Sequence, residues 1–180
     1  MKELFNSFKH RAYRIETLPN YQVGSEIKSY NNFINGLPLD YGDKEWINNL
    51  IQWKKEGKKV KRIRIISEEL TTYEKYEFYC YHNNFIAGEE IKIIPRHIYK
   101  NLVSKEYQFD YWIFDDTYIC KLNYDSQGNY INNTILSKNI NKYIEIYKLL
   151  DSNAKLNYYE IVKQINNYNV KINFNCGSVN

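Results

Sequence analysis

The chain has 180 residues, of which 43% are hydrophobic and 26% are charged, and its formal net charge at pH 7 is +4. This balance is typical of one globular domain and excludes an intrinsically disordered chain. The net charge is too small to indicate a nucleic-acid-binding protein by itself.

The apolar and cysteine patterns favour a cytoplasmic protein. No run approaches the roughly 18 apolar residues that a membrane span needs, so we expect no membrane partner. The N-terminus lacks the apolar core of a signal peptide. Three cysteines without a C-x-x-C pair predict free thiols, and the histidine spacing predicts neither a metal site nor a cofactor. The cysteines are Cys80, Cys120 and Cys176.

Tyrosine is unusually frequent, with 19 copies. Asparagine, lysine and isoleucine are abundant too, and an AT-rich genome encodes all four residues. Coding bias therefore explains the tyrosines more simply than a dedicated stacking surface does, although composition alone decides neither.

The first third of the chain predicts helices. Over residues 1–20, apolar side chains recur at helical spacing until Pro19. They are Phe5, Phe8, Ala12 and Ile15. A second helical segment spans residues 24–35, and a third spans 43–57, where Asp43 caps the first turn and Gly57 ends the last.

The middle of the chain predicts a βαβ unit. Residues 59–67 alternate as a strand, and residues 71–88 read as a helix that opens with a capping box of Thr71 and Glu74. A second strand follows at 89–96 and is cut by Pro95. Strand, helix and strand together predict a parallel crossover.

The segment 107–130 reads as strand, acidic turn, strand and second turn. We expect Trp112 to be buried against the preceding helix, with Phe78 and Tyr81 as neighbours. A helix capped by Ser137 should follow up to residue 150. The tail predicts a helical piece at 158–167 and a last strand at 170–174.

These elements predict an α/β fold: a mixed sheet with a βαβ unit flanked by helices. We expect a single domain over residues 1–180. Its parts are a helical N-terminal segment at 1–58, an α/β core at 59–150 and a C-terminal extension at 151–180.

The strongest site candidates are two arginines that alternate on one strand face, Arg62 and Arg64. Helices cover such a face in an α/β sheet, so the arginines need carboxylate partners. Glu16, Glu77 and Asp110 are available. The pattern fits either an interior ion-pair network or an anion pocket at the carboxyl ends of the strands. For the pocket, the candidate ligand-binding residues are Arg62, Arg64, Ser67, Glu68, Tyr73, Glu77, Arg96, Asp110 and Asp115.

Other polar clusters have simpler explanations. The aspartates of residues 110–125 could bind a hard cation, but turn chemistry explains them better. The basic run at 54–64 could contact phosphates, but its lysines fit a helix C-terminus. His10 and His97 read as ordinary surface histidines.

Five blocks together resemble a bacterial domain family of unknown function, frequent in actinobacteria, that often accompanies helix-turn-helix regulators. They are RIETLPNY (14–21), RIRIISEELTTYEKYEF (62–78), AGEEIKIIPR (87–96), FDYWIFDD (109–116) and YDSQGNY (124–130). The resemblance covers residues 4–150. Its most specific parts are the E-T-L-P and D-[FY]-W-x-F-D-D blocks. The family usually has arginine at the position of Lys75, so no charge role is carried over there.

The element order is also similar to one half of the phospholipase-D-like fold. The catalytic motif of that fold is H-x-K-x-x-x-x-D. Matching its aspartate to Asp115 puts Gln108 and Asp110 at the histidine and lysine positions, and matching it to Asp116 puts Phe109 and Tyr111 there. Neither register supplies the nucleophile that the two-step phosphoryl mechanism needs. The resemblance therefore implies a non-catalytic relative.

The leading hypothesis is a non-enzymatic regulatory or interaction domain, in transcriptional regulation or defence, that binds a partner protein or a small anionic ligand. The alternative is an enzyme acting on a nucleotide or phosphoester through an Arg/Glu/Asp cleft. A third hypothesis, nucleic-acid binding through residues 54–64 and surface tyrosines, predicts steeply salt-dependent binding.

Overall fold

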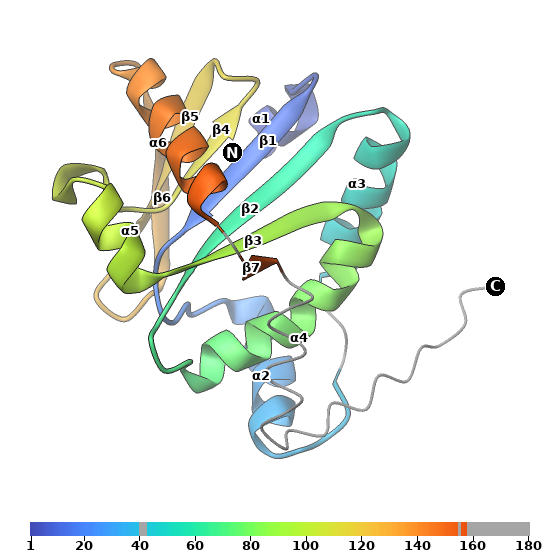
Figure 1. Ribbon diagram of the computed structural model, residues 1–180. Helices are drawn as coiled ribbons and strands as arrows, with labels where there is room; N and C mark the ends of the chain where they lie inside the picture. Colours follow the sequence, from blue (N-terminus) through green and yellow to red (C-terminus); the bar gives the residue numbers. More distant parts are fainter. Residues whose placement is uncertain (40–42, 155, 158–180) are drawn as a thin grey trace.

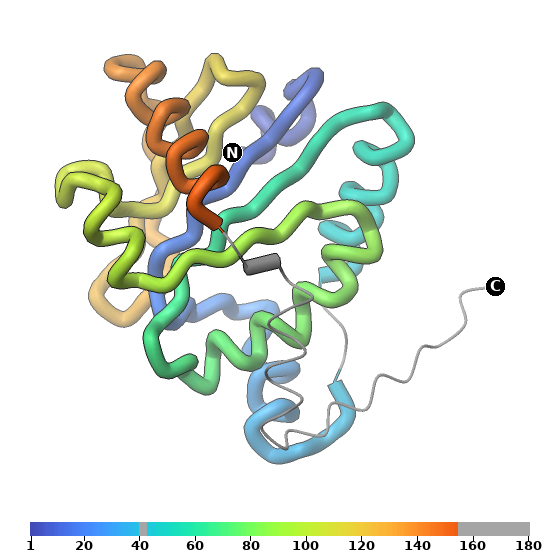
Figure 2. Tube along the Cα trace, in the orientation of Figure 1, coloured from blue at the N-terminus to red at the C-terminus, as the bar shows by residue number. Residues whose placement is uncertain are grey.

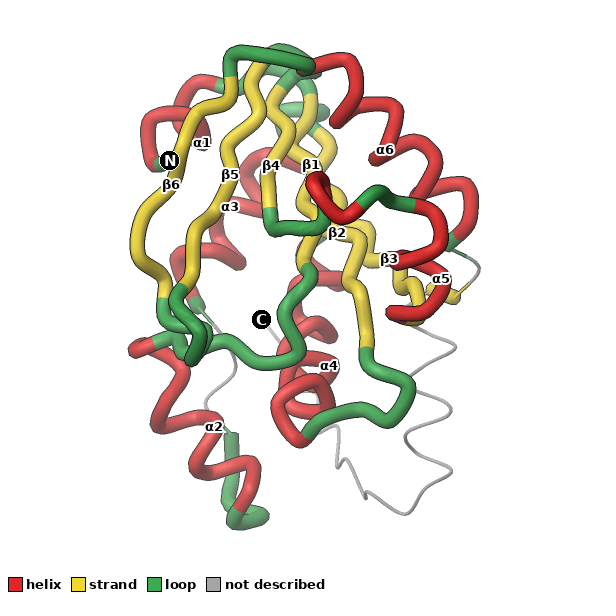
Figure 3. Tube along the Cα trace, turned by 90° about the vertical axis from the view of Figure 1, so that its left-hand side faces the viewer, coloured by secondary structure: helices red, strands yellow, loops and turns green. Residues whose placement is uncertain are grey.

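The computed structural model describes residues 1–39, 43–154 and 156–157. One mixed sheet organises them, with the strand order β6-β5-β4-β1-β2-β3-β7, and Figure 3 shows the strands from β6 to β3 in this order. The strands are β1 (Arg11–Glu16), β2 (Lys59–Ile66), β3 (Glu89–Pro95), β4 (Tyr111–Phe114), β5 (Tyr118–Tyr124), β6 (Tyr130–Leu136) and β7 (Leu156–Asn157).

Helices pack on both faces of the sheet, and Figure 1 shows α5 and α6 in front of it. The α-helices are α1 (Lys2–Ser7), α2 (Ile27–Ile34), α3 (Lys44–Lys55), α4 (Thr72–Ala87), α5 (Arg96–Leu102) and α6 (Ile140–Asn153). Two 3-10 turns are η1 (Gly24–Glu26) and η2 (Lys105–Tyr107). Within the described ranges, no helix combines the length and apolar character needed to cross a membrane.

The α/β class and the predicted βαβ unit are confirmed. Strands β2 and β3 are parallel neighbours, and α4 connects them. The capping box forms as predicted, with the Thr71 side chain accepting from the Glu74 N–H and the Glu74 carboxylate accepting from the Thr71 N–H. Gly88 ends the helix with φ +114. Residues other than glycine rarely adopt this backbone conformation.

Hydrophobic core clusters lie on both faces of the sheet. On one face, Ile15, Ile63 and Ile113 pack against the residues of α5 and α6. On the other face, Ala12 and Val60 pack with α1 and α3 residues. Burial on both faces explains why the central strands carry so few exposed side chains.

The predicted helix over the first residues is wrong from residue 11 onward. Only α1 is helical, and β1 lies in the middle of the sheet, parallel to β2 and antiparallel to β4. Figure 2 shows this blue segment running between the traces of β2 and β4. Ala12 and Ile15 therefore face opposite cores instead of sharing a helical stripe. The segment 1–58, predicted to be helical, therefore contributes β1 to the sheet.

Several other elements differ from the prediction. The α6 helix begins after Asn139, which has φ +57 and makes no side-chain capping hydrogen bond, so the predicted Ser137 cap is wrong. The sequence did not indicate α5, β6 or β7. The predicted elements at 158–167 and 170–174 lie outside the described residues.

Candidate functional site

Three arginines lie together on the sheet face that α3 and α4 cover. Arg14 of β1 pairs in register with Arg62 of β2, and Arg64 follows two positions later on the same face. The side chains of Arg14, Arg62 and Arg64 are 7%, 12% and 1% exposed. Buried charges need partners, so the neighbouring carboxylates determine what this row of arginines can do.

Arg62 is held between two carboxylates. Its Nε donates to Oε1 of Glu89 at 2.8 Å, and its Nη1 donates to Oε2 of Glu16 at 2.6 Å. The guanidinium also lies 5.0 Å from the ring centroid of Tyr81. Asn84 donates to Glu89 at 2.9 Å and so fixes the second carboxylate. The charge of Arg62 is therefore neutralised within the protein.

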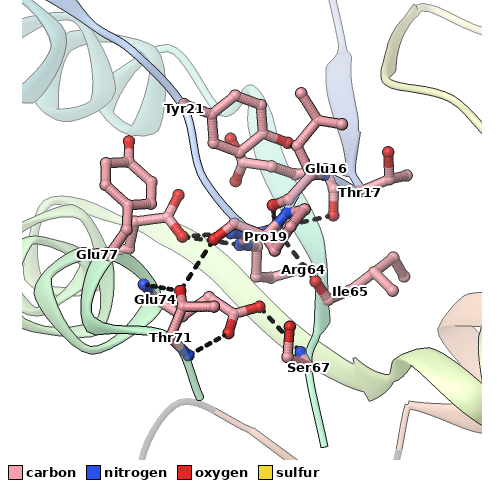
Figure 4. Close-up of polar contacts among 12 residues, drawn as sticks. Glu16, Thr17, Pro19, Tyr21, Arg64, Ile65, Ser67, Thr71, Glu74 and Glu77 are labelled. Carbon is pink, nitrogen blue, oxygen red and sulfur yellow. Dashed lines mark hydrogen bonds and ion pairs between the residues drawn. The ribbon is translucent and has the colours of Figure 1, made fainter. Parts of the chain in front are cut away.

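Arg64 joins β2 to α4 and to the segment after β1, as Figure 4 shows. Its Nε donates to Oε2 of Glu77 at 3.0 Å, and its Nη2 forms an ion pair with the same oxygen. Its Nη1 donates to the backbone carbonyls of Leu18 at 2.6 Å and Ile65 at 3.1 Å. These contacts bury the guanidinium and connect the strand to the helix and to the segment after β1.

Asp110 pairs with Arg14, not with Arg62 or Arg64 as the sequence led us to expect. Arg14 Nη2 donates to Asp110 Oδ2 at 2.9 Å. The same carboxylate accepts from the N–H and hydroxyl of Thr17 at 2.8 and 2.6 Å, and from the Tyr21 hydroxyl at 2.7 Å. Both oxygens of the buried Asp110 carboxylate therefore accept hydrogen bonds, and these bonds fix the segment that follows β1.

The residues expected beyond the carboxyl ends of the strands are dispersed among local contacts. The Ser67 backbone N–H donates to the Glu74 carboxylate at 2.9 Å, which Figure 4 also shows. The Arg96 guanidinium donates to the Thr17 carbonyl at 2.7 Å. Glu68 accepts from the His97 backbone and contacts the ring nitrogen Nδ1 at 2.6 Å. These contacts fix the turns around the ends of the strands.

Asp115 lies at the opposite end of the strands from Ser67 and Arg96, because β4 runs antiparallel to β1, so its predicted place beside them is wrong. Its carboxylate accepts from the backbone N–H groups of Lys9, His10 and Arg11 at 2.6, 2.8 and 2.9 Å. The following residue, Asp116, pairs with the Arg11 side chain. Both aspartates adopt positive φ, so they form a turn in which their side chains reach the same segment.

A cavity of about 370 Å³ adjoins the arginine row, between the sheet, α3, α4 and the segment that leads into α2. It is lined by Met1, Phe5, Arg14, Glu16, Tyr21, Val23, Glu26, Asp43, Trp46, Arg62, Tyr73, Tyr76, Glu77, Cys80, Tyr81, Asn84, Trp112 and Tyr124. Val23 and Asp43 are exposed and mark its opening. Aromatic and charged side chains therefore dominate one shared concave surface.

Tyrosine hydroxyls connect the aromatic walls to the carboxylates. Tyr73 donates to Glu26 at 2.9 Å, and Tyr81 donates to Glu16 at 2.7 Å. The rings also contact one another edge to face, for example Tyr21 and Tyr124 at a centroid separation of 5.2 Å. Such bonded aromatic walls are preformed and lose little freedom when a ligand enters.

The carboxylates of this region differ in their electrostatic environment. Burial opposes ionisation of Glu16, but Arg62, Arg14 and Arg64 outweigh it and hold its pKa well below the usual value. Burial raises the pKa of Glu77, and the nearby charge of Glu16 adds to this effect against the opposing Arg64. Burial also raises the pKa of Glu26. Glu16 is therefore firmly ionised, whereas a cation near Glu26 or Glu77 would favour their charged forms.

The structure brings together part of the predicted set. Arg62, Tyr73 and Glu77 line the cavity, while Arg64 and Asp110 lie behind the residues that line it. Ser67, Glu68, Arg96 and Asp115 are not in the lining. Sequence reasoning missed the lining residues Arg14, Tyr21, Glu26, Trp46 and Trp112. Recognition of β1 as a strand would have placed Arg14 and Glu16 on one face by alternation.

Trp112 is buried, but its predicted neighbours are wrong. It packs with Phe5, Trp46 and Phe114 at ring-centroid distances of 5.0, 5.9 and 5.9 Å. Phe78 and Tyr81 belong to a different core cluster. The Arg14 guanidinium lies 5.6 Å from the Trp112 ring centroid. Trp112 thus joins the core under α1 and α3 to the cavity.

Across the described ranges, no group of three or more His, Cys, Asp and Glu side chains is placed to hold a metal ion. No curated protein and no solved structure gives a significant match to the chain. The sequence profile of the family described as "Domain of unknown function (DUF6879)" matches residues 1–154, which include every residue of the arginine row and of the cavity lining. The chain therefore belongs to the DUF6879 family of domains of unknown function.

Proposed function

We propose that this is a non-enzymatic regulatory or interaction domain that binds a small ligand, or a side chain of a partner protein, in the aromatic cavity. The observation that carries the proposal is the cavity itself. Its volume of about 370 Å³ lies within the size range of ligand pockets, and aromatic residues with a few convergent polar groups line it.

The chemistry of the lining favours binding over catalysis. Cys80 supplies a thiol to the lining, but burial raises its pKa to about 12, so little thiolate is present at neutral pH. The carboxylates of Glu16 and Glu77 are engaged by arginines. A catalytic nucleophile needs an activated form near neutral pH, and the shifted pKa values of Cys80 and Glu16 disfavour such a form. Burial raises the pKa of Glu77, but Arg64 holds its carboxylate.

The small anionic ligand that the arginine pattern predicts is one version of this proposal. Arg14 and Arg62 do line the cavity, which supports it. An anion would, however, compete with Glu16, Glu89 and Asp110, which already neutralise these guanidiniums. A partner side chain or a ligand without negative charge meets no such competition.

The wider biological setting is part of the proposal. The resemblance of the five sequence blocks suggests a role beside helix-turn-helix regulators or in defence, and the free thiols Cys80 and Cys120 support a cytoplasmic location. The βαβ unit followed by an antiparallel hairpin supports a relation to one half of the phospholipase-D-like fold. Either Gln108 and Asp110 or Phe109 and Tyr111 then stand where that fold has its catalytic histidine and lysine.

Mass spectrometry under non-denaturing conditions tests the binding proposal on the purified full chain. Two variants should fill the cavity from different sides: Cys80→Phe from α4 and Val23→Trp from its opening. We expect the wild-type chain to retain a small molecule that both variants lose. Circular dichroism checks that each variant is folded. A molecule retained equally by folded variants would show that the cavity is not the binding site.

Turnover assays on the same three proteins test the enzymatic alternative. Hydrolysis of a nucleotide or phosphoester that is lost in both folded cavity variants would replace the binding proposal with a catalytic one. Hydrolysis that survives in both variants would come from elsewhere and would leave the binding proposal in place.

A further inference from the structure

The side chains that line the cavity carry more negative than positive charge. Glu16, Glu26 and Asp43 stand against the guanidiniums of Arg14 and Arg62, whereas Glu77 is paired with Arg64 behind the lining. The buried network behind the lining does not correct this imbalance, because Arg64 is matched by Glu77 while Glu89 and Asp110 add two further carboxylates. An incoming cation would therefore reduce the electrostatic cost of burying these carboxylates.

Glu26 is the lining carboxylate that is best placed to receive a cation. It forms no ion pair with any residue in the described part of the chain, and its side-chain partner is the Tyr73 hydroxyl at 2.9 Å. Glu16 and Glu77, by contrast, are bound to arginines. Glu26 is partly buried, and burial raises its pKa. A cation beside Glu26 would supply the charge partner that the protein does not.

Aromatic rings enclose the same space. Tyr21, Tyr73, Tyr76 and Tyr124 contact one another as one group in the lining, and Trp46 and Trp112 contact each other as a second. The faces of tyrosine and tryptophan rings attract cations, and cages of such rings recognise alkylammonium groups. The rings already bind cations inside this protein, since Arg14 lies over Trp112 and Arg62 over Tyr81.

From these observations we infer that the cavity recognises a positively charged organic group, an alkylammonium or a guanidinium, between its aromatic walls and Glu26. The group is carried either by a free small molecule or by a lysine or arginine side chain of a partner protein. The inference rests on the proposed binding function and names its ligand class.

Binding of matched probes to the full chain tests this inference by isothermal titration calorimetry. Choline carries the cation, and 3,3-dimethylbutan-1-ol is its neutral carbon isostere. We expect choline to bind about tenfold more tightly than the alcohol, as the strength of desolvated cation–π contacts implies. Fluorescence of Trp46 and Trp112, which line the cavity, should change with choline at the same concentrations.

Two isosteric variants locate the cation. Glu26→Gln keeps an acceptor for the Tyr73 hydroxyl and removes one charge. Glu145→Gln removes the same charge from an exposed position on α6, the helix that covers the other face of the sheet. We expect Glu26→Gln to weaken choline binding by about three- to tenfold and to leave alcohol binding unchanged. Glu145→Gln should change neither.

Capped pentapeptides with a central arginine, lysine or norleucine separate the two sources of the cation. Tighter binding of the arginine or lysine peptide than of choline, with the same loss in Glu26→Gln, would assign the site to a partner side chain. Tighter binding of choline would assign it to a free small molecule. Either result supports the cation inference.

Other outcomes overturn the inference. Equal affinity for choline and its neutral isostere would do so, and so would equal effects of Glu26→Gln and Glu145→Gln. If adenosine monophosphate binds and the cavity-filling variants lose it while no cation binds, the cation inference fails and the binding function stands. If no probe binds and no molecule is retained in the mass spectrum, both fail.

Discussion

Arg64 of β2 and Glu77 of α4 form an ion pair in which the guanidinium side chain is 1% exposed and the carboxylate side chain 8%. The pair connects the sheet to the crossover helix beneath the cavity. Removal of one partner leaves the other charge buried without compensation, which typically costs about 3–5 kcal/mol.

We therefore expect Arg64→Met to lower the free energy of unfolding by about 3–5 kcal/mol, measured by urea denaturation. Glu77→Leu should have a similar effect. The double variant should lose clearly less than the sum of the two, because it contains no unpaired charge. Additive losses would show that the two side chains do not act as a pair.

Trp112 should be essential for stability. Its ring is 4% exposed and packs between Phe5, Trp46 and Phe114. Trp112→Ala should cost about 3–5 kcal/mol, as large aromatic truncations in cores do. Tyr118, which is 51% exposed on the same hairpin, supplies the control, and Tyr118→Ala should change stability by less than about 0.5 kcal/mol. Similar losses in both variants would contradict the packing.

Asp115 should matter more to stability than its neighbour Asp116. Asp115 accepts three backbone N–H groups from residues 9–11, in the manner of a helix cap, so Asp115→Ala should cost about 1–2 kcal/mol. Asp116 pairs with a partly exposed arginine, and Asp116→Ala should cost less than about 1 kcal/mol. Equal costs would show that the backbone hydrogen bonds of Asp115 contribute little.

The contribution of Asp115 should also depend on pH. Partial burial opposes ionisation, but the N–H groups of Lys9, Arg11 and His10 outweigh it and lower the pKa below the ordinary value of 3.8. A lowered pKa in the folded state stabilises the fold at pH values above the unfolded pKa, and this stabilisation is lost as the pH falls. The stability difference between wild type and Asp115→Ala should therefore be constant above about pH 5 and shrink below pH 4. A stability difference that grows on acidification would show that the folded state raises the pKa of Asp115 instead of lowering it.

All three cysteines should titrate as free thiols in the unfolded, non-reduced protein. Cys80 and Cys120 are free, and Cys176 lies outside the described residues. In the native protein, burial raises the pKa of both described thiols, that of Cys80 to about 12, so their reaction with a disulfide reagent at pH 8 should be slow. Fewer than three thiols after unfolding would indicate a bridge.

The chain should not hydrolyse generic phosphodiesters by the phospholipase-D route. The positions that would carry the nucleophile are Gln108 or Phe109, and neither can form a covalent phosphoryl intermediate. Incubation with bis(4-nitrophenyl) phosphate should release no product above background. A phosphohistidine at His10, His82 or His97, detected by mass spectrometry, would refute this prediction.

Local patterns in the sequence determined the elements whose hydrogen bonds are local. Asp43 caps α3 through the N–H groups of Glu45 and Trp46, and Thr71 with Glu74 caps α4. Alternation marked β2 and β3, because apolar and polar side chains of a strand face different environments. From these features alone, the α/β class and the parallel crossover could be predicted.

Only the tertiary structure decided that residues 11–16 form a central strand. This strand buries Arg14 and Glu16, which look like surface residues in the sequence, because partners distant in the chain neutralise them. The partner of Arg14 is Asp110, 96 residues away. The spacing of residues along the chain cannot reveal a pairing over such a distance. The apolar residues of this segment recur at three- and four-residue intervals, so they predicted a helix.

The candidate site depends on the same long-range contacts. Arg62, Tyr73 and Glu77 were identifiable from the βαβ unit, but the cavity also needs Glu26 from η1, Trp46 from α3 and other residues that no local pattern connects. Conversely, the sequence predicted Asp115 beside Ser67, but β4 is antiparallel to β1, so Asp115 lies at the other end of the strands. Strand direction and order are set by packing of the whole chain, and they determine which charged residues meet.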